Sequence, residues 1–382
     1  MDVQLDKKVS QISVGEAQRV EIIKTLMRGA DIIILDEPTA VLTPQEAERL
    51  FEILNNLKQD GKSLVFISHK LNEVMAISDR ISVMRQGQYM GTVNKEETSP
   101  LDLTKRMIGR EVFLNIDKAY SEAGDTILEV QDVWIPSQKE TSKIRGMSLH
   151  VKAGEIVGVA GIDGNGQSEL VEAITGLRKV EKGKILLCGK DITNQSPRKV
   201  RESGLSHIPE DRNTRGLNRA MTIEENLIAV RLDQPPFTKG IMMNKSGQDT
   251  YAKEMVEQFD IRPADYSLPT SSLSGGNAQK VVVAREVSLG NKLLVASQPT
   301  RGVDIGAIEL IRNTLEKAKK AGAGVLLVSA ELEEIISLSD RIVVIHEGKI
   351  TGEMRADEAN ENNLGLLMMG GTDTGKDGEA AV

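Results

Sequence analysis

Short apolar runs alternate with amphipathic stretches along most of this 382-residue chain. Residues 31–36 and 63–68 are rich in β-branched and aliphatic side chains and are bounded by turn or polar residues, a pattern typical of buried, central strands of a parallel sheet. Between them, residues 44–61 carry apolar side chains at helical spacing and stop at Gly61, a common helix terminator. The pattern therefore predicts a strand, helix, strand unit of an α/β fold.

A second unit of this kind, residues 155–177, contains a glycine-rich turn between the predicted strand and helix. Gly161, Gly166 and Ser168 fit the phosphate-binding pattern G-x-x-x-x-G-K-[ST], but Gln167 replaces the lysine. Glycines let backbone amides approach phosphates, and a serine hydroxyl here would coordinate Mg²⁺. Gln167 can donate a hydrogen bond but brings no charge, so we expect weaker nucleotide binding and still weaker catalysis. The predicted contacts are Gly161, Gly164, Asn165, Gly166, Gln167, Ser168 and Glu169; the alternative is a glycine turn without a ligand.

The chain also contains an internal repeat. ISVGEAQ at 12–18 resembles LSGGNAQ at 273–279, and 274 minus 13 gives an offset of 261. The same offset places LDEPTA over ASQPTR and continues without a gap to Gly348. The second copy has a further stretch, with the glycine loop, that the first copy lacks. The loop of the first copy would lie before Met1, so the pattern predicts an N-terminal truncation of roughly 130 residues.

Two acids end the first predicted strand of copy one. Asp36 would hold Mg²⁺ through water, and Glu37 would orient and polarise an attacking water. Copy two has Ser297 and Gln298 at these positions, and neither carries a negative charge. We therefore expect the acid chemistry in copy one only; the alternative is a strand end with two solvated acids.

A histidine follows the next strand of copy one. His69 would contact a γ-phosphate and sense its loss, whereas Ala330 occupies its place in copy two. The alternative for a lone histidine at a strand end is a plain surface residue.

LSGGNAQK in copy two places two glycines at the start of a predicted helix, where free amides and the helix dipole favour a phosphate. The predicted contacts are Ser274, Gly275, Gly276 and Asn277. The alternative is a helix capped by Ser274 without a ligand. In copy one Val14 crowds this position and Glu16 lies near where an anion would sit, so that version should receive phosphate poorly.

Composition excludes several classes of protein. The net charge of -8 and pI near 5.4 disfavour nucleic acid as a partner. No apolar run is long enough to span a bilayer, and the N-terminus lacks the apolar core of a secretory signal, so the cytosol is the expected compartment. The single cysteine, Cys188, excludes an internal disulfide.

Together, these motifs resemble the ATP-binding subunits of ATP-binding-cassette importers over residues 9–365. They are most similar to the double-cassette subunits for monosaccharides and nucleosides, and GIDGNGQSEL with ASQPTRGVD is most similar to the nucleoside branch. The resemblance implies an α/β P-loop NTPase cassette with a parallel-rich central sheet, a small antiparallel β subdomain and a helical signature subdomain. It also implies ATP, Mg²⁺, membrane permease subunits, an extracytoplasmic solute-binding protein, and peripheral attachment to the cytoplasmic face of the membrane.

In the implied arrangement two cassettes close head to tail. Asp36, Glu37 and His69 would then face the signature of copy two and hydrolyse ATP, while the Gln167 loop would bind nucleotide without turning it over. SHIPEDR at 206–212 stands where the family usually has a glutamine, and residues 218–271 would contact the permease. The expected domains are the C-terminal part of a first cassette (1–115), a polar linker (116–126), a second, degenerate cassette (127–365) and a disordered tail (366–382).

Two alternatives remain open. The first is a hydrolytically silent nucleotide-binding fragment with a regulatory role or none in transport, which Gln167 favours. The second is a soluble cassette protein acting on ribosomes or DNA, but such proteins usually keep both sites intact and carry a charged helical linker, and this sequence shows neither.

Overall fold

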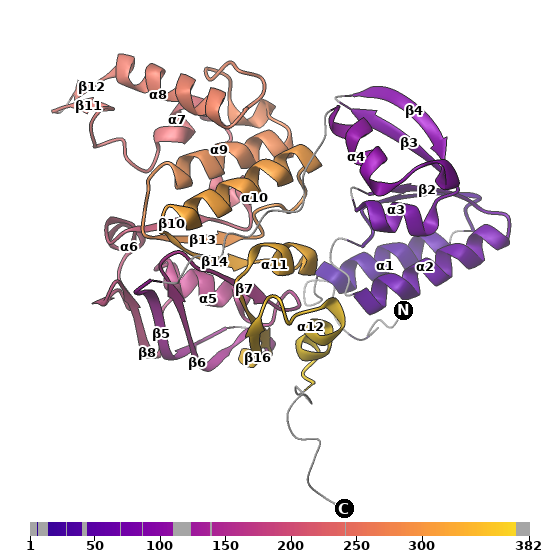
Figure 1. The fold of residues 1–382 in the computed structure, drawn as a ribbon, viewed down its shortest axis with the longest axis horizontal. Coiled ribbons are helices and arrows are strands. Elements are labelled where there is room, and N and C mark those ends of the chain that lie inside the picture. Colours follow the sequence, from indigo (N-terminus) through magenta and orange to yellow (C-terminus); the bar gives the residue numbers. More distant parts are fainter. Residues whose placement is uncertain are drawn as a thin grey trace, which may run out of the picture. The chain divides into compact units, whose positions relative to one another are not determined.

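The computed structural model describes residues 6, 14–27, 29–39, 44–68, 70–85, 87–109, 124–137, 140–240 and 242–371. The chain divides into two compact units, Met1–Phe113 (unit 1) and Leu114–Val382 (unit 2). Figure 1 shows the helices and strands of both units, coloured along the sequence.

Unit 2 is built on a six-stranded sheet in the order β10-β13-β14-β7-β15-β16. Neighbouring strands are parallel except for β16, which is antiparallel to β15. The strands are β7 (Ile156–Ala160), β10 (Leu205–Ile208), β13 (Leu293–Ser297), β14 (Gly324–Val328), β15 (Arg341–His346) and β16 (Lys349–Arg355). The central strands are fully buried because both faces of the sheet are covered.

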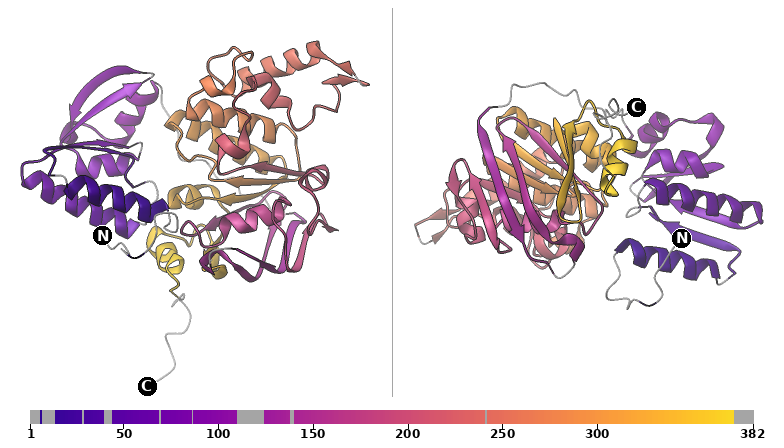
Figure 2. Two further views of the ribbon diagram at one scale, coloured as in Figure 1. Left: turned by 180° about the vertical axis from the view of Figure 1, so that it is seen from behind. Right: turned by 90° about the horizontal axis from the view of Figure 1, so that it is seen from below.

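A four-stranded antiparallel sheet and α5 cover one face of the central sheet (Figures 1 and 2). Its strands are β5 (Thr126–Ile135), β6 (Ile144–Lys152), β8 (Lys182–Leu187) and β9 (Lys190–Asp191), and the helices on this side are α5 (Gln167–Ile174) and α6 (Pro197–Glu202). Alternate residues of the central strands pack into this layer, as the two-residue period of a strand requires.

Helices cover the other face. They are α7 (Ile223–Ile228), α8 (Lys245–Gln258), α9 (Gly275–Val287), α10 (Ile305–Lys320), α11 (Leu332–Leu338) and α12 (Glu361–Met368). A small hairpin of β11 (Thr238–Lys239) and β12 (Met242–Met243) precedes α8. Together the elements give the predicted combination of a parallel-rich sheet, a small antiparallel sheet and a helical part.

Unit 1 contains a parallel pair of strands, β1 with β2, and an antiparallel pair, β3 with β4. Its elements are α1 (Val14–Met27), β1 (Ile32–Asp36), α2 (Pro44–Gln59), β2 (Ser63–Ile67), α3 (Leu71–Ile77), β3 (Arg80–Arg85), β4 (Gln88–Asn94) and α4 (Pro100–Ile108). A small core beneath β1 includes Leu50 and Leu54 of α2, both fully buried.

The elements repeat with the offset found in the sequence. Adding 261 to the bounds of β1 gives those of β13, and the same shift carries α2 onto α10, β2 onto β14 and α3 onto α11. The sequence repeat is therefore also a repeat of secondary structure.

The two units differ at the strand that lies between β14 and β15 in unit 2. That strand is β7, and among the described residues of unit 1 no strand joins β2 to β3. Ile34 is 65% exposed, whereas its counterpart Val295 is fully buried. The expectation that β1 is a buried central strand is therefore wrong for the described part of unit 1. Burial of β13 depends on the layer of β5, β6, β8 and α5, which its own sequence pattern does not encode.

Two predicted boundaries meet the structure only in part. Residues 116–123 of the expected linker and 372–382 of the expected tail lie outside the described part of the chain. Helix α12 continues to Met368, so it enters the tail expected from residue 366, because Leu367 and Met368 pack into the core of unit 2. The division into cassettes stays a prediction.

Candidate nucleotide site

The glycine loop of unit 2 connects the end of β7 to the start of α5, as the sequence predicted. Gly166 is the residue before the helix and has a φ of 112°, a conformation that strongly favours glycine. A Cβ on Gly166 would lie 2.7 Å from Cδ1 of Ile144, and one on Gly161 would lie 2.7 Å from the carbonyl oxygen of Ile345. The loop therefore needs these glycines to keep its shape, with the amides of the first turn of α5 at its mouth.

Gln167 is buried in this loop rather than extended from it. Its Nε2 donates a hydrogen bond to the carbonyl oxygen of Ile162 at 3.1 Å. The side chain thus stabilises the loop, and the position that carries a cation in the usual phosphate-loop pattern is neutral.

Two other predicted contacts are used inside the unit. Asn165 accepts a hydrogen bond from the backbone amide of Glu347 at 2.8 Å and donates one to the Ile162 carbonyl at 3.1 Å. Glu169 accepts one from the Ser137 hydroxyl at 3.0 Å. Both side chains therefore stabilise the loop through hydrogen bonds within unit 2. Gly164, with a φ of 90°, lies in the exposed part of the loop.

Ser168 is exposed, and its hydroxyl donates to Oε2 of Glu210 at 3.2 Å. The other oxygen of Glu210 accepts a hydrogen bond from Arg301 at 2.8 Å. A second carboxylate, Asp163 of the loop, lies 3.8 Å from the same guanidinium nitrogen. Sequence reasoning missed Glu210 and Arg301, although both lie within motifs that it quoted, SHIPEDR and ASQPTRGVD.

The carboxyl ends of β1 and β13 have the same local geometry. Glu37 and Gln298 follow the two strands with φ values of 45° and 47°, rare for residues other than glycine. The amide of Glu37 donates to the Ile67 carbonyl at 2.8 Å, and that of Gln298 to the Val328 carbonyl at 2.7 Å. Such strain is often found at functional sites. Glu37 of unit 1 and Gln298 of unit 2 thus share one backbone conformation. They differ in the charge of the side chain.

A threonine–glutamate hydrogen bond follows each strand end, part-buried in unit 1 and buried in unit 2. In unit 1 the Thr39 hydroxyl donates to Glu73 at 2.6 Å, and in unit 2 the Thr300 hydroxyl donates to Glu334 at 2.8 Å. Burial raises the pKa of the Glu334 carboxyl.

The remaining predicted residues of unit 1 are partly visible. Asp36 ends β1 with an exposed side chain, next to Glu37. His69 lies outside the described residues, as do Ser13 and the side chains of Val14 and Glu16. The two acids therefore lie at the carboxyl end of β1, as predicted from the sequence. The role of His69 stays a prediction.

The signature residues of unit 2 form a capped helix start. Ser274 precedes α9, and its hydroxyl oxygen accepts hydrogen bonds from the backbone amide of Asn277 at 3.4 Å and from its side-chain amide at 3.0 Å. Asn277 in turn accepts one from the Arg262 amide at 2.8 Å. The capping role offered as the alternative is present, and phosphate binding at this helix start stays a prediction.

The two signature glycines lie close to the ends of two charged side chains. A Cβ on Gly275 would lie 2.7 Å from a guanidinium nitrogen of Arg212, and one on Gly276 would lie 2.5 Å from Oδ2 of Asp304. Arg212 donates to the carbonyl oxygens of Arg301 at 2.8 Å and Gly302 at 3.1 Å. Arg212, another residue that sequence reasoning did not identify, thus connects the segment after β10 to the loop after β13, close to Gly275 of the signature.

These features define a class of protein. A parallel-rich sheet, a glycine loop between a strand and a helix, and a second helix that is capped by a serine and begins with two glycines form an ATP-binding cassette of the P-loop NTPase kind.

Comparison with known proteins places the chain more narrowly. The family described as "ABC transporter" matches residues 1–40 and 144–301. The chain is 48% identical over 371 residues to the nucleoside import ATP-binding protein NupA of Lactococcus lactis, and 45% identical over 372 residues to the guanosine import ATP-binding protein NupO of Bacillus subtilis. Each match covers 97% of this chain and 73% of the relative.

A solved structure, the nucleotide-free ATP-binding cassette of an ABC transporter, superimposes with a TM-score of 0.53 and 26% identity, over 63% of this chain and 95% of that chain. The chain therefore belongs to the ABC transporter family, among its import ATP-binding subunits. The predicted P-loop cassette fold is confirmed. These subunits are ATPases, and ATP-driven solute import is the activity that the chain's relatives share.

No helix in the described part of the chain has the length and apolar character needed to cross a membrane.

Proposed function

We propose that this chain is the ATP-hydrolysing subunit of a nucleoside importer, with a monosaccharide as the second candidate solute. The observation that carries the proposal is its similarity, over 97% of its length, to two relatives named for nucleoside and guanosine import. A relative from Haloferax volcanii named for glucose import, 43% identical, is the reason for keeping a sugar as the alternative.

We propose further that unit 1 is the C-terminal part of a first cassette and unit 2 a second, degenerate one. The shared offset of 261 supports this division. The open face of unit 1 around Ile34 corresponds to the face that the layer of β5, β6, β8 and α5 covers in unit 2. Hydrolysis would then use Glu37 as the group that polarises the attacking water, with His69 beside the γ-phosphate. The signature Ser274–Asn277 is proposed as a further phosphate contact.

The site at the Gln167 loop would bind nucleotide without turning it over. Gln167 lacks the positive charge that stabilises the transferred phosphoryl group, and Gln298 lacks the negative charge that polarises water. Glycines and backbone amides at the start of α5 remain available for phosphate oxygens.

Mg²⁺ fits both proposed sites by the chemistry of the donors. The exposed Ser168 hydroxyl and the Glu210 carboxylate lie 3.2 Å apart, and hard oxygen donors together with nucleotide phosphates are the usual environment of this ion. Asp36, exposed at the end of β1, would hold Mg²⁺ through water at the other site. When bound, the ion would neutralise phosphate charge.

The expected partners are separate membrane permeases and an extracytoplasmic solute-binding protein, with the chain attached peripherally at the cytoplasmic face. We place the permease contact in residues 218–271, which form α7, the β11–β12 hairpin and α8 at one end of unit 2 (Figure 1). Met242 and Met243 of this hairpin are 72% and 59% exposed, so apolar surface is available there.

A second candidate function is a nucleotide-binding module that does not hydrolyse ATP. Gln167 and Gln298 favour it for unit 2, since each removes a charge that hydrolysis uses. Under this alternative the chain would bind ATP, and its transport system would not depend on Glu37.

Uptake measurements test the proposed function. Cells that lack the subunit would be supplied with the chain joined to the phosphate-loop half of a first cassette, as wild type or as Glu37→Gln, and uptake of labelled nucleosides, ribose and glucose would be compared. We expect wild type alone to restore uptake of a nucleoside. Uptake restored equally by Glu37→Gln would support the non-hydrolysing module, and uptake of glucose or ribose alone would transfer the proposal to sugars.

A further inference from the structure

An arginine lies at the mouth of the phosphate loop that lost its lysine. The Arg301 guanidinium is 2.8 Å from Oε1 of Glu210 and 3.8 Å from Oδ2 of Asp163, a residue of the loop itself. Glu210 also accepts the hydrogen bond of Ser168. The cation is therefore separated from the Ser168 hydroxyl by a single carboxylate.

The backbone around Arg301 is held firmly, while its side chain is not buried. Its amide donates to the Gln298 carbonyl at 3.1 Å, and its carbonyl accepts a hydrogen bond from Arg212 at 2.8 Å. The side chain is 36% exposed, so its ion pairs are partly solvated and can exchange partners at low cost. Hydrogen bonds thus fix the backbone of Arg301, while its partly exposed guanidinium can change partners.

We propose that Arg301 supplies to the β- and γ-phosphates of a bound nucleotide the positive charge that Gln167 does not. This rests on the proposed function of the loop as a nucleotide site. In the structure Glu210 and Asp163 neutralise the guanidinium. When a magnesium nucleotide binds, Glu210 and Ser168 turn to the metal ion and Arg301 pairs with phosphate oxygens, for which its planar, multidentate donor geometry is suited.

The exchange balances charge at each step. With one cation, Arg301, and two carboxylates, Asp163 and Glu210, the mouth of the loop is by itself a poor receptor for an anion. Mg²⁺ at Glu210 removes one negative charge and releases the guanidinium, so metal and nucleotide favour each other's binding. A lysine at position 167 would make this exchange unnecessary. The exchange therefore accounts for the presence of Gln167 and Arg301 in the same site.

Direct binding to the full chain tests the proposal. Affinities for Mg-ATP and for AMP, which lacks the β- and γ-phosphates, would be measured by isothermal titration for wild type, Arg301→Gln and Arg301→Lys. We expect Arg301→Gln to weaken Mg-ATP binding by about tenfold to a hundredfold, because charge-assisted hydrogen bonds to phosphate are lost. AMP should bind as before, and Arg301→Lys should keep most of the affinity for Mg-ATP.

Arg198→Gln is the matched control. Arg198 is exposed and paired with Glu202 at 2.9 Å and Asp233 at 3.0 Å, so it resembles Arg301 in chemistry but belongs to α6. Its substitution should leave both affinities unchanged. Equal Mg-ATP affinity in wild type and Arg301→Gln would overturn the inference, and so would an equal loss in Arg301→Gln and Arg301→Lys, which would indicate a structural role.

Glu210→Gln gives an independent readout. Without Mg²⁺, removing this carboxylate should tighten ATP binding, because Arg301 is no longer held by it. In the Arg301→Gln background the same change should have a clearly smaller effect, as for two residues that act on each other. Equal effects in both backgrounds would contradict the exchange. Absence of ATP binding by wild type would overturn the proposed function together with the inference, whereas binding insensitive to Arg301 would overturn the inference alone.

Discussion

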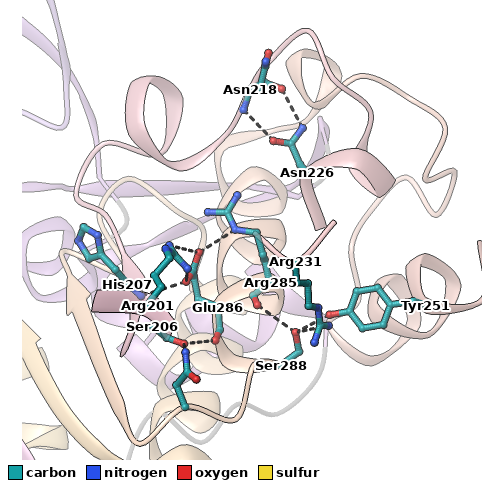
Figure 3. Close-up of polar contacts among 11 residues, drawn as sticks. Arg201, Ser206, His207, Asn218, Asn226, Arg231, Tyr251, Arg285, Glu286 and Ser288 are labelled. Atoms are coloured by element: carbon teal, nitrogen blue, oxygen red, sulfur yellow. Dashed lines mark hydrogen bonds and ion pairs between the residues drawn. The ribbon is translucent and has the colours of Figure 1, made fainter. Parts of the chain in front are cut away.

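Glu286 is the buried centre of an ion-pair network whose removal should be measurable without any ligand. It lies on α9, is fully buried, and accepts hydrogen bonds from Arg201 at 2.8 and 3.1 Å and from Arg285 at 2.9 Å (Figure 3). The backbone amide of His207 adds another at 3.2 Å. Burial opposes ionisation, but the two arginines outweigh it and keep the pKa of Glu286 below its ordinary value.

Glu286→Ala removes the acceptor and leaves both guanidinium groups without their shared partner. Breaking a buried ion pair from one side costs about 3–5 kcal/mol. For a unit of this size each kcal/mol corresponds to about 2–4 °C, so the midpoint of unfolding should fall by about 6–20 °C. Arg285, itself buried, contributes most of the penalty because water cannot replace the lost carboxylate.

Tryptophan fluorescence isolates the unit concerned. The chain has a single tryptophan, Trp134, and it belongs to β5 of unit 2. Thermal unfolding followed by its emission therefore reports unit 2 without a contribution from unit 1. Glu202→Ala is the control, since Glu202 pairs with Arg198 on the exposed surface of α6 and its loss should move the midpoint by no more than roughly 3 °C. A shift of the unfolding midpoint by no more than roughly 3 °C for Glu286→Ala would refute this reasoning.

Three further predictions concern the stability of the two units. Burial lowers the pKa of His207 from 6.5 to about 4, so the unfolded chain takes up a proton that the folded chain excludes; stability should fall by up to about 3 kcal/mol as the pH drops from 6.5 to 4, and His207→Gln should flatten this dependence in fluorescence-detected urea unfolding. Gly166→Ala should lower the thermal midpoint of unit 2 and weaken ATP binding in titration, because its Cβ would meet Ile144 and its φ is positive. Val295→Ala should cost about 1–3 kcal/mol in urea unfolding while its exposed counterpart Ile34→Ala costs less than about 0.5, and equal costs would contradict the open face of unit 1.

The fold was largely predictable because its signals are local. The apolar runs around β1 and β2, the helical spacing of α2 and the glycines of the phosphate loop all lie within short windows of sequence. The repeat extended those signals to a second copy, and the observed elements keep its offset. The exposure of Ile34 could not be predicted from the residues of β1. It depends on whether another layer of the fold covers that face of the strand.

The candidate site was predictable only in its loop residues. Contacts from Ser168 to Glu210 and from Glu210 to Arg301 join positions 42 and 91 residues apart, and no periodic pattern connects them. Arg212 was missed for the same reason, since its partners lie beyond the next helices of the chain. Comparing the two copies offered a signal, because Arg301 of the second copy aligns with the uncharged Ala40 of the first. The second copy thus gains a positive charge at position 301 and has no lysine at position 167 of its loop.

Steady-state ATP turnover tests whether hydrolysis depends on Glu37 of unit 1. The chain would be joined to the phosphate-loop half of a first cassette, and wild type would be compared with Glu37→Gln. We expect wild type to turn over ATP and Glu37→Gln to abolish turnover while ATP binding persists, because unit 2 binds nucleotide at the Gln167 loop without hydrolysing it. Turnover that survives Glu37→Gln would show that unit 2 hydrolyses ATP despite Gln167 and Gln298, and would contradict the division of roles between the two units.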